Sequence, residues 1–130
     1  MIAKTRAYIS FDYDHDKELK DSLMAQSKLE DSPFEIVDMS IEEAIDHNWK
    51  DYARGKIKQS DLVIFICGKY TDTARGVSAE MSITHEEGKE YFLLCGRSDE
   101  RVVKPSGSHS SDKIYRWTWD NLKLLISGSR

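Results

Sequence analysis

The segment 61–67 constrains the fold more than any other part of the sequence. After Asp61 it reads Leu-Val-Ile-Phe-Ile-Cys, with no polar residue in the run. A continuous apolar run of this length is typical of a strand that is covered on both faces, as in the middle of a parallel sheet. We therefore expect residues 61–67 to form the central strand of an α/β sheet.

Four other segments have the apolar, branched and aromatic residues of short strands, and helical patterns separate them. The expected strands cover residues 7–11, 34–37, 91–95 and 113–115. The expected helices follow Asp16, span residues 49–59 and 77–87, and begin after Thr118. This alternation favours a three-layer α/β fold with a five-stranded parallel sheet in the order 2-1-3-4-5.

Length and composition indicate one domain, which we expect to span residues 1–130. The net charge of −4 argues against nucleic acid as a partner. The sequence shows no apolar signal-peptide core and no run long enough to span a membrane, so we expect a cytoplasmic protein without membrane association. In that compartment the two cysteines, Cys67 and Cys95, should stay reduced, with Cys67 buried.

Several familiar site motifs are absent. The glycines form neither a G-x-G-x-x-G motif nor a P-loop, and the four histidines lack metal-binding spacing. Asp12, Asp14 and Asp16 are not followed by the glycine and glutamate of a calcium loop, so we expect no metal. The same aspartates resemble the acidic cluster of a receiver domain, but residues 61–67 end without an aspartate to accept a phosphoryl group. Helix capping in a solvated loop is the simpler interpretation.

Residues suited to a nucleotide follow the first and third expected strands. Ser10, Phe11 and Tyr13 end the first strand, Tyr70 follows the third, and Glu80 lies about one turn into the next helix. Ligands bind at the carboxyl ends of strands in α/β sheets, where rings can stack on a base and a carboxylate can hold ribose hydroxyls. Alternatively, Glu80 is a helix carboxylate near the N-terminal turn, where we expect it to be partly exposed, and Phe11 packs in the core.

An ordered set of short motifs resembles the TIR-like family that includes the Thoeris anti-phage signalling proteins. The resemblance runs from about residue 5 to 126 and implies a flavodoxin-like fold. The motifs are Tyr8-Ile9-Ser10-Phe11, Trp49-x-x-Tyr52-x4-Ile57-x-x-Ser60-Asp61-x-Val63-Ile64-x3-Gly68-x-x-Thr71, Val77-Ser78-Ala79-Glu80-Met81 and Lys113-Ile114-Tyr115-x-Trp117-Thr118-Trp119-Asp120-Asn121.

The resemblance also implies an activity, because many members cleave NAD at the nicotinamide–ribose bond. Glu80 matches the family's catalytic glutamate. We therefore expect NAD as the substrate, without a separate cofactor, and Ser10, Phe11, Tyr13 and Tyr70 as its binding residues. Water as the nucleophile gives ADP-ribose and an internal group gives a cyclic isomer, a nucleotide signal that would reach an effector protein.

Two positions depart from the family's pattern. Many relatives carry tryptophan four residues and one residue before the glutamate, where this chain has Gly76 and Ala79. The departure leaves room for a member that does not turn over NAD. The alternative function is a non-catalytic TIR-like interaction module that associates with itself or a partner through a surface such as residues 40–48.

Overall fold

The structure is a computed structural model, and it describes residues 4–40 and 48–130. Its sheet has five parallel strands in the order β2-β1-β3-β4-β5, as predicted. The strands are β1 (Thr5–Ser10), β2 (Phe34–Met39), β3 (Leu62–Cys67), β4 (Glu90–Cys95) and β5 (Ile114–Tyr115). The other elements are the helices α1 (Lys17–Ser27), α2 (Trp49–Gln59), α3 (Arg75–Glu86) and α4 (Trp119–Ile126), and the short 3-10 helix η2 (Thr71–Thr73).

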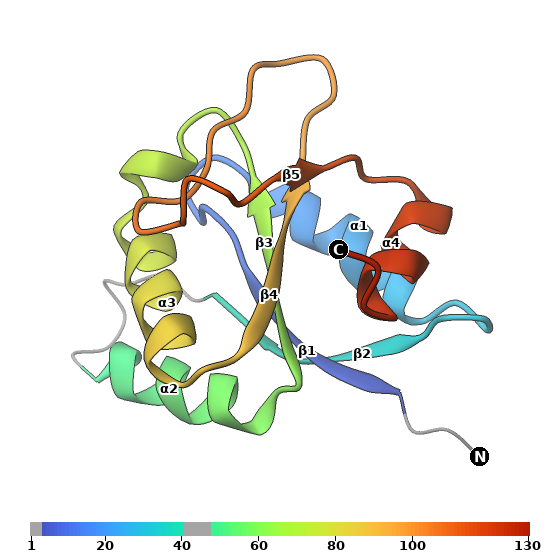
Figure 1. Cartoon of the computed structure of the whole chain (residues 1–130), viewed down its shortest axis with the longest axis horizontal. Helices are drawn as coiled ribbons and strands as arrows, with labels where there is room; N and C mark the ends of the chain where they lie inside the picture. Colours follow the sequence, from blue (N-terminus) through green and yellow to red (C-terminus); the bar gives the residue numbers. More distant parts are fainter. Residues whose placement is uncertain (1–3, 41–47) are drawn as a thin grey trace.

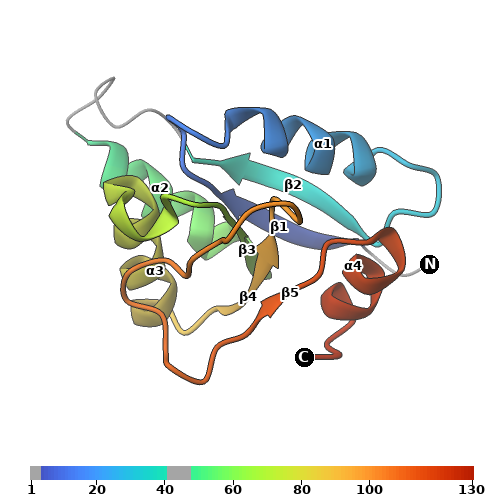
Figure 2. The same ribbon diagram turned by 90° about the horizontal axis from the view of Figure 1, so that it is seen from above.

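Helices cover both faces of the sheet. The helices α2 and α3 lie on one face, and α1 and α4 lie on the other (Figure 1), which the view from above shows as three layers (Figure 2). This is the flavodoxin-like α/β arrangement that the sequence predicts. None of the helices in the described parts of the chain is both long and apolar enough to cross a membrane.

The strand β3 is the centre of the core, and all six of its residues are buried. Because successive side chains of a strand point to opposite faces, its apolar run supplies two cores. Val63 and Phe65 pack under α2 and α3, whereas Ile64 and Ile66 pack under α1 and α4. Burying each such side chain contributes about 1.5–3 kcal/mol, so β3 accounts for the presence of helices on both faces.

The same alternation sorts the residues of β1. Tyr8 belongs to the core under α2 and α3, whereas Ala7, Ile9 and Phe11 belong to the core under α1 and α4. Residues of even number in this strand therefore face α3. This parity decides which side chains at the end of β1 can reach the helix that carries Glu80.

The C-terminal helix docks as the sequence predicts. Thr118 caps α4, since its Oγ1 accepts a hydrogen bond from the amide of Asn121 at 3.1 Å. Trp117 and Trp119 pack on the core under α1 and α4 and so anchor the start of α4. Their indole Nε1 atoms donate to Gln26 at 2.8 Å and to Asp31 at 3.2 Å.

The start of α1 differs from the prediction. Asp16 occupies the N-cap position of α1 but makes no capping hydrogen bond, so the prediction of a capping side chain is wrong there. Its carboxylate pairs with Arg97 instead, at 3.2 Å.

Most of the predicted interaction surface at residues 40–48 lies outside the described residues, because positions 41–47 are not among them.

The cysteines lie side by side on neighbouring strands. Cys67 and Cys95 are register partners in the pairing of β3 with β4, and both thiols are free. Cys67 is buried, as predicted. Burial raises the pKa of its thiol to about 12, which keeps it protonated and unreactive at neutral pH.

The tight contact at the ends of β3 and β4 gives a test of the fold. A Cβ atom on Gly96 would lie 2.9 Å from the Cys67 carbonyl oxygen and 2.7 Å from Leu19 Cδ1. We expect Gly96→Ala to lower the free energy of unfolding by about 1–3 kcal/mol in urea denaturation, because backbone must move. Gly55→Ala is the matched control, since a Cβ there meets nothing within 4 Å, and it should stabilise α2 by about 0.5–1 kcal/mol. Two variants that shift stability in the same direction would contradict this packing.

Candidate functional site

Glu80 lies inside the protein, where α3 meets β1 and the residue after β2. Its Oε1 accepts hydrogen bonds from the hydroxyls of Ser10 at 2.7 Å and Ser40 at 2.5 Å. Its Oε2 accepts a hydrogen bond from the hydroxyl of Tyr8. All four residues are buried, and Glu80 itself is only 1% exposed. We call Glu80, Tyr8, Ser10 and Ser40 the carboxylate–hydroxyl cluster.

The helical period of α3 explains why Glu80 points inward. Val77, Glu80, Met81 and Thr84 are spaced as i, i+3, i+4 and i+7, which places them on one face of a helix, and all four are buried. The Thr84 hydroxyl also donates to the Glu80 carbonyl at 2.7 Å. The prediction of a partly exposed Glu80 is therefore wrong. The neighbouring apolar positions carry the signal that could have corrected it.

Strand geometry brings the three hydroxyls to the carboxylate. Tyr8 and Ser10 have the same parity in β1, so both side chains face α3. Ser40 follows β2, and its amide donates to the Ile9 carbonyl at 2.8 Å. Its Oγ in turn accepts from the Phe11 amide at 3.1 Å. Parallel pairing of β1 with β2 thus places the Ser40 hydroxyl beside that of Ser10.

The environment of Glu80 brings the pKa of its carboxyl group close to neutral pH. Burial raises the pKa of the Glu80 carboxyl to about 7, against the hydrogen bonds from Ser40, Tyr8 and Ser10, which lower it. Burial and the nearby Glu80 carboxylate also raise the pKa of Tyr8, which stays a neutral hydrogen-bond donor. The cluster therefore holds a carboxyl group that is present in both protonation states near pH 7. A titratable group of this kind is typical of functional sites.

The side chains of the other residues expected to bind NAD do not contact Glu80, although the Phe11 amide donates to Ser40 of the cluster. Phe11, the residue after β1, is 2% exposed and belongs to the core under α1 and α4, on the same side as Ala7 and Ile9. Tyr13 packs against the same core, with its ring 6.1 Å from that of Phe11. Tyr70 is 44% exposed, and its ring lies 4.3 Å from that of His15. Of the four, the structure brings only Ser10 into contact with Glu80.

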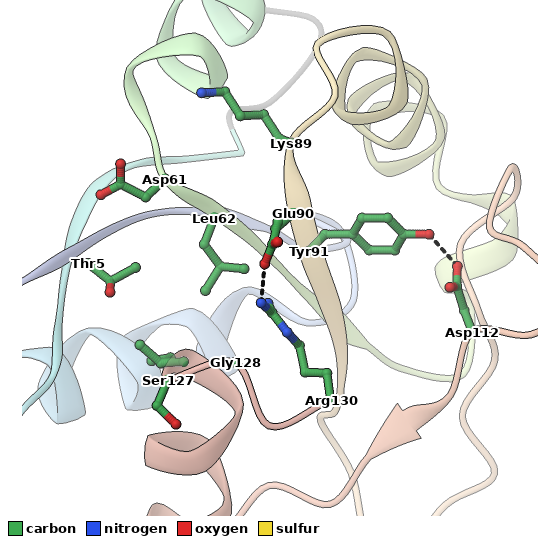
Figure 3. A pocket seen from close by; sticks show the side chains of 11 residues that line it. Thr5, Asp61, Leu62, Lys89, Glu90, Tyr91, Asp112, Ser127, Gly128 and Arg130 are labelled. Atoms are coloured by element: carbon green, nitrogen blue, oxygen red, sulfur yellow. Dashed lines mark hydrogen bonds and ion pairs between the residues drawn. The ribbon is translucent and has the colours of Figure 1, made fainter.

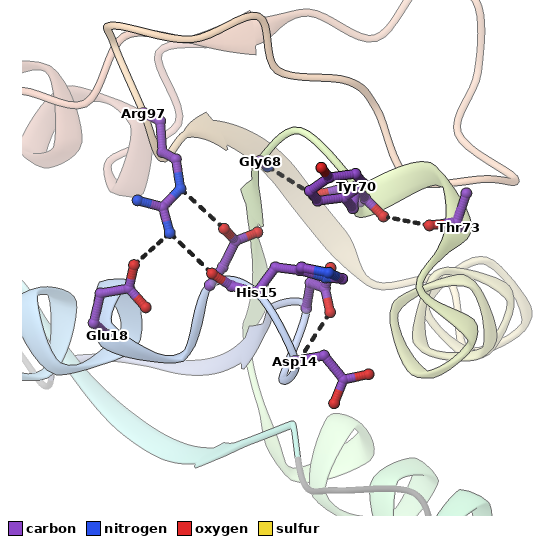
Figure 4. Close-up of polar contacts among 10 residues, drawn as sticks. Asp14, His15, Glu18, Gly68, Tyr70, Thr73 and Arg97 are labelled. Atoms are coloured by element: carbon purple, nitrogen blue, oxygen red, sulfur yellow. Dashed lines mark hydrogen bonds and ion pairs between the residues drawn. The ribbon is translucent and has the colours of Figure 1, made fainter.

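The acidic loop after β1 is tied to the end of β4 by Arg97 (Figure 4). Arg97 donates to Asp16 at 3.2 Å, to the His15 carbonyl at 2.9 Å, and to Glu18. Burial raises the pKa of Asp16, and the Arg97 guanidinium acts in the opposite direction. Asp12 accepts a hydrogen bond from the amide of Asp14 at 3.1 Å. Among the described residues no three His, Cys, Asp or Glu side chains are grouped to hold a metal ion.

Cavities outside the carboxylate–hydroxyl cluster include one at the amino edge of the sheet and one beside α3. One of about 740 Å³ opens at the amino ends of β1, β3 and β4, the edge of the sheet opposite to Ser10 (Figure 3). There Arg130 pairs with Glu90, and the Tyr91 hydroxyl donates to Asp112 at 2.5 Å. The other, of about 500 Å³, runs beside the first half of α3 and is lined in part by Trp49, Ser78 and Ala79. The second cavity therefore adjoins the helix of Glu80.

The sequence matches the family described as Thoeris protein ThsB, TIR-like domain, over residues 8–101. The chain belongs to this family. The matched region includes all four residues of the carboxylate–hydroxyl cluster, the second half of β1 and the strands β2 to β4. No curated protein matches the chain. The protein is thus a TIR-like protein of anti-phage defence, built on a parallel α/β sheet.

Sequence reasoning missed two members of the cluster in this TIR-like domain. Tyr8 looks like a strand residue of a buried core, and nothing local shows that its hydroxyl meets a carboxylate from α3. Ser40 stands just after β2, where the local pattern gives no hint of a partner 40 residues away. The available signal for Tyr8 was its parity with Ser10. For Ser40 the contact depends on the pairing of two strands.

The raised pKa of Glu80 predicts how pH affects the stability of the TIR-like domain. The folded pKa of about 7 lies above the ordinary value of 4.5, so the folded state binds the proton more tightly than the unfolded state. Stability should be greatest below pH 4.5 and fall by about 3 kcal/mol as pH rises to about 7, other groups being equal. Urea denaturation of wild type and Glu80→Gln from pH 5 to 8 isolates this contribution, because the glutamine does not titrate.

The expected result is a wild-type free energy of unfolding that falls with pH relative to that of Glu80→Gln. Glu100→Gln is the control, since Glu100 is exposed, and its difference from wild type should show no such slope. A flat difference between wild type and Glu80→Gln would contradict the buried position of the carboxyl group.

Proposed function

We propose that this TIR-like protein cleaves NAD at the nicotinamide–ribose bond, with Glu80 as the catalytic carboxylate. One observation carries the proposal. A buried carboxylate, at the position that matches the family's catalytic glutamate, accepts three hydroxyl hydrogen bonds beside the carboxyl ends of β1 and β2. Ribose hydroxyls are donors of the same kind as Ser10 and Ser40, so a ribose can exchange with them on the carboxylate.

The reaction breaks the bond between the nicotinamide nitrogen and the anomeric carbon of the ribose. Both bonding electrons leave with nicotinamide, which departs neutral and needs no proton. Positive charge then develops on the ribose ring, and an ionised Glu80 stabilises it more in the transition state than in the ground state. Addition of water to the anomeric carbon, with loss of a proton, gives ADP-ribose. Attack by a group within the same molecule gives a cyclic ADP-ribose isomer.

The residues around the cluster suggest how NAD is held. Ser10 touches Glu80 directly and is the binding residue nearest to the reacting bond. Tyr70 offers an exposed ring at the carboxyl edge of the sheet, and Tyr13 a half-buried one. Phe11 is a core residue and would act by fixing the end of β1 rather than by stacking on the base.

The product would serve as a signal. ADP-ribose or its cyclic isomer diffuses freely, so an effector protein can respond to it without touching this chain. Self-association of the TIR-like domain is a further proposal.

A non-catalytic interaction module is the second candidate, and one observation favours it. Both oxygens of Glu80 already have hydroxyl partners within the chain, so the carboxylate can act as a tie between α3, β1 and the end of β2. Gly76 and Ala79, in place of the tryptophans of many relatives, agree with this alternative. This alternative predicts that the wild-type protein does not cleave NAD and that Glu80→Gln changes only the stability of the fold.

Substitution of Glu80 tests the catalytic proposal. We expect Glu80→Gln to lower nicotinamide release by about a hundredfold or more, because glutamine keeps the shape but removes the negative charge. The assay measures nicotinamide and ADP-ribose by chromatography, with protein triggered by infected-cell lysate. Glu86→Gln on the same helix is the matched control, since its side chain is 60% exposed, and it should cleave NAD at a near-normal rate.

Two outcomes would contradict the catalytic proposal. Turnover by Glu80→Gln within a few-fold of wild type would leave Glu80 with a structural role alone. A triggered wild-type protein that never consumes NAD would favour the interaction module.

The pH dependence of cleavage gives an independent test. Catalysis requires the ionised form of Glu80, and its pKa lies at about 7. We therefore expect kcat/KM to rise about tenfold per pH unit below neutrality and to level off above it. Measurements of nicotinamide release from pH 5.5 to 8.5 would show this rise and the plateau above it. A rate that falls as pH rises through 7 would mean that the protonated carboxyl is the active form.

A further inference from the structure

We infer that Asp38 is the general base of the reaction, which takes the proton from the oxygen nucleophile that attacks the ribose. The nucleophile is water or a ribose hydroxyl of the same NAD molecule. Asp38 lies in β2, two residues before Ser40 of the carboxylate–hydroxyl cluster. This role rests on the proposed function, and it adds a second carboxylate to the site of Glu80.

A bulge in β2 turns Asp38 toward the face of the sheet that α2 and α3 cover. Ala7 of β1 pairs with Ile36, and the next residue, Tyr8, pairs with Asp38. Val37 is therefore the extra residue of the bulge and has no register partner in β1. Without it, Asp38 would have the parity of Ile36, which packs on the core under α1 and α4. Bulges are found next to active sites, where they redirect a side chain in this way.

Two donors hold the Asp38 carboxylate. Its Oδ2 accepts a hydrogen bond from the Tyr52 hydroxyl of α2 at 2.5 Å, and its Oδ1 accepts one from the Met39 amide at 2.9 Å. Each carboxylate oxygen has two lone pairs, so each can accept a further hydrogen bond. Asp38 is half-buried and Tyr52 is 45% exposed, whereas Glu80 is 1% exposed. A nucleophile can therefore reach Asp38 from solvent.

Strand geometry places Asp38 one strand repeat from a residue that contacts Glu80. Two residues of a parallel strand span about 6.6 Å, and Ser40, two residues after Asp38, donates to Glu80. The paired carboxylates of inverting glycosidases are about 6.5–9.5 Å apart, which leaves room for the attacking water. Burial raises the pKa of Glu80 most, and the negative charge of Asp38 raises it further, as two nearby carboxylates require. The spacing along β2 thus allows a nucleophile between them.

The two carboxylates have different tasks in the second half of the reaction. Glu80 stabilises the positive ribose ring after nicotinamide has left with the electron pair of the broken bond. A lone pair of the nucleophile's oxygen forms the new bond to the anomeric carbon, and its O–H proton passes to the Asp38 carboxylate and then to solvent. Removal of this proton as the bond forms keeps positive charge from building up on the attacking oxygen.

The test follows two activities of the triggered protein, formation of ADP-ribose or its cyclic isomer and exchange of ¹⁴C-nicotinamide from solution into NAD. Asp38→Ala should lower product formation by about a hundredfold, within the usual contribution of a general base. It should keep nicotinamide exchange, because breaking the nicotinamide–ribose bond does not need the base. Azide should restore turnover and give an ADP-ribosyl azide, because azide is already anionic and has no proton to lose.

Matched variants separate this role from others. Glu80→Gln should lose both exchange and product formation, and azide should restore neither. Asp38→Asn removes the base but keeps the shape, so it serves as the test if Asp38→Ala does not fold. Tyr52→Phe leaves the base in place and should lower product formation less than tenfold. Glu35→Gln, at an exposed position of the same strand, is the control and should behave as wild type.

Three results would overturn the inference. Product formation by both Asp38 variants within a few-fold of wild type would exclude a base at this position. Equal loss of exchange and product formation, without rescue by azide, would leave Asp38 with a role in folding or binding alone. A triggered wild-type protein that consumes no NAD would overturn the proposed function and this role with it, whereas the first two results leave NAD cleavage by Glu80 intact.

Discussion

The burial of β3 on both faces is the constraint on which the rest of the structure depends. Its six residues expose almost no surface, so helices must cover the sheet on each side. The helix α3 meets this need with Val77 and Met81, which pack on the same core as Phe65. Glu80 lies on the same face of α3 as Val77 and Met81. When this face packs on the sheet, the carboxylate of Glu80 is therefore turned inward. Packing of the core thus determines the geometry of the candidate site.

An inward carboxylate is costly unless it is hydrogen-bonded or loses its charge. The TIR-like domain uses both means. Tyr8, Ser10 and Ser40 donate to the two oxygens, and burial brings the pKa of Glu80 to about 7. The group can therefore lose its proton at neutral pH with little cost. This property fits a carboxylate that is negatively charged when a ribose cation forms beside it. It also fits a structural carboxylate whose hydrogen bonds hold α3, β1 and the end of β2 together.

Local patterns in the sequence were enough for the fold but only for part of the site. The apolar run at residues 61–67 and the start of a helix after Thr118 can be recognised from neighbouring residues in the sequence, and both were predicted. The inward position of Glu80 and the core position of Phe11 follow from helical period and strand parity. Ser40 could not be found from local patterns, because its contact with Glu80 spans 40 residues and exists only once β1 and β2 pair.

The central claim is that the Glu80 carboxyl is buried among three hydroxyls, and its own titration tests this most directly. NMR of protein labelled with ¹³C at glutamate side-chain carboxyls, with Glu80→Gln to assign the signal, gives the pKa. We expect a value near 7 in the wild-type protein. Ser40→Ala should raise it further, because the Ser40 hydroxyl stabilises the ionised form. A Glu80 pKa near the ordinary 4.5, unchanged by Ser40→Ala, would contradict the account.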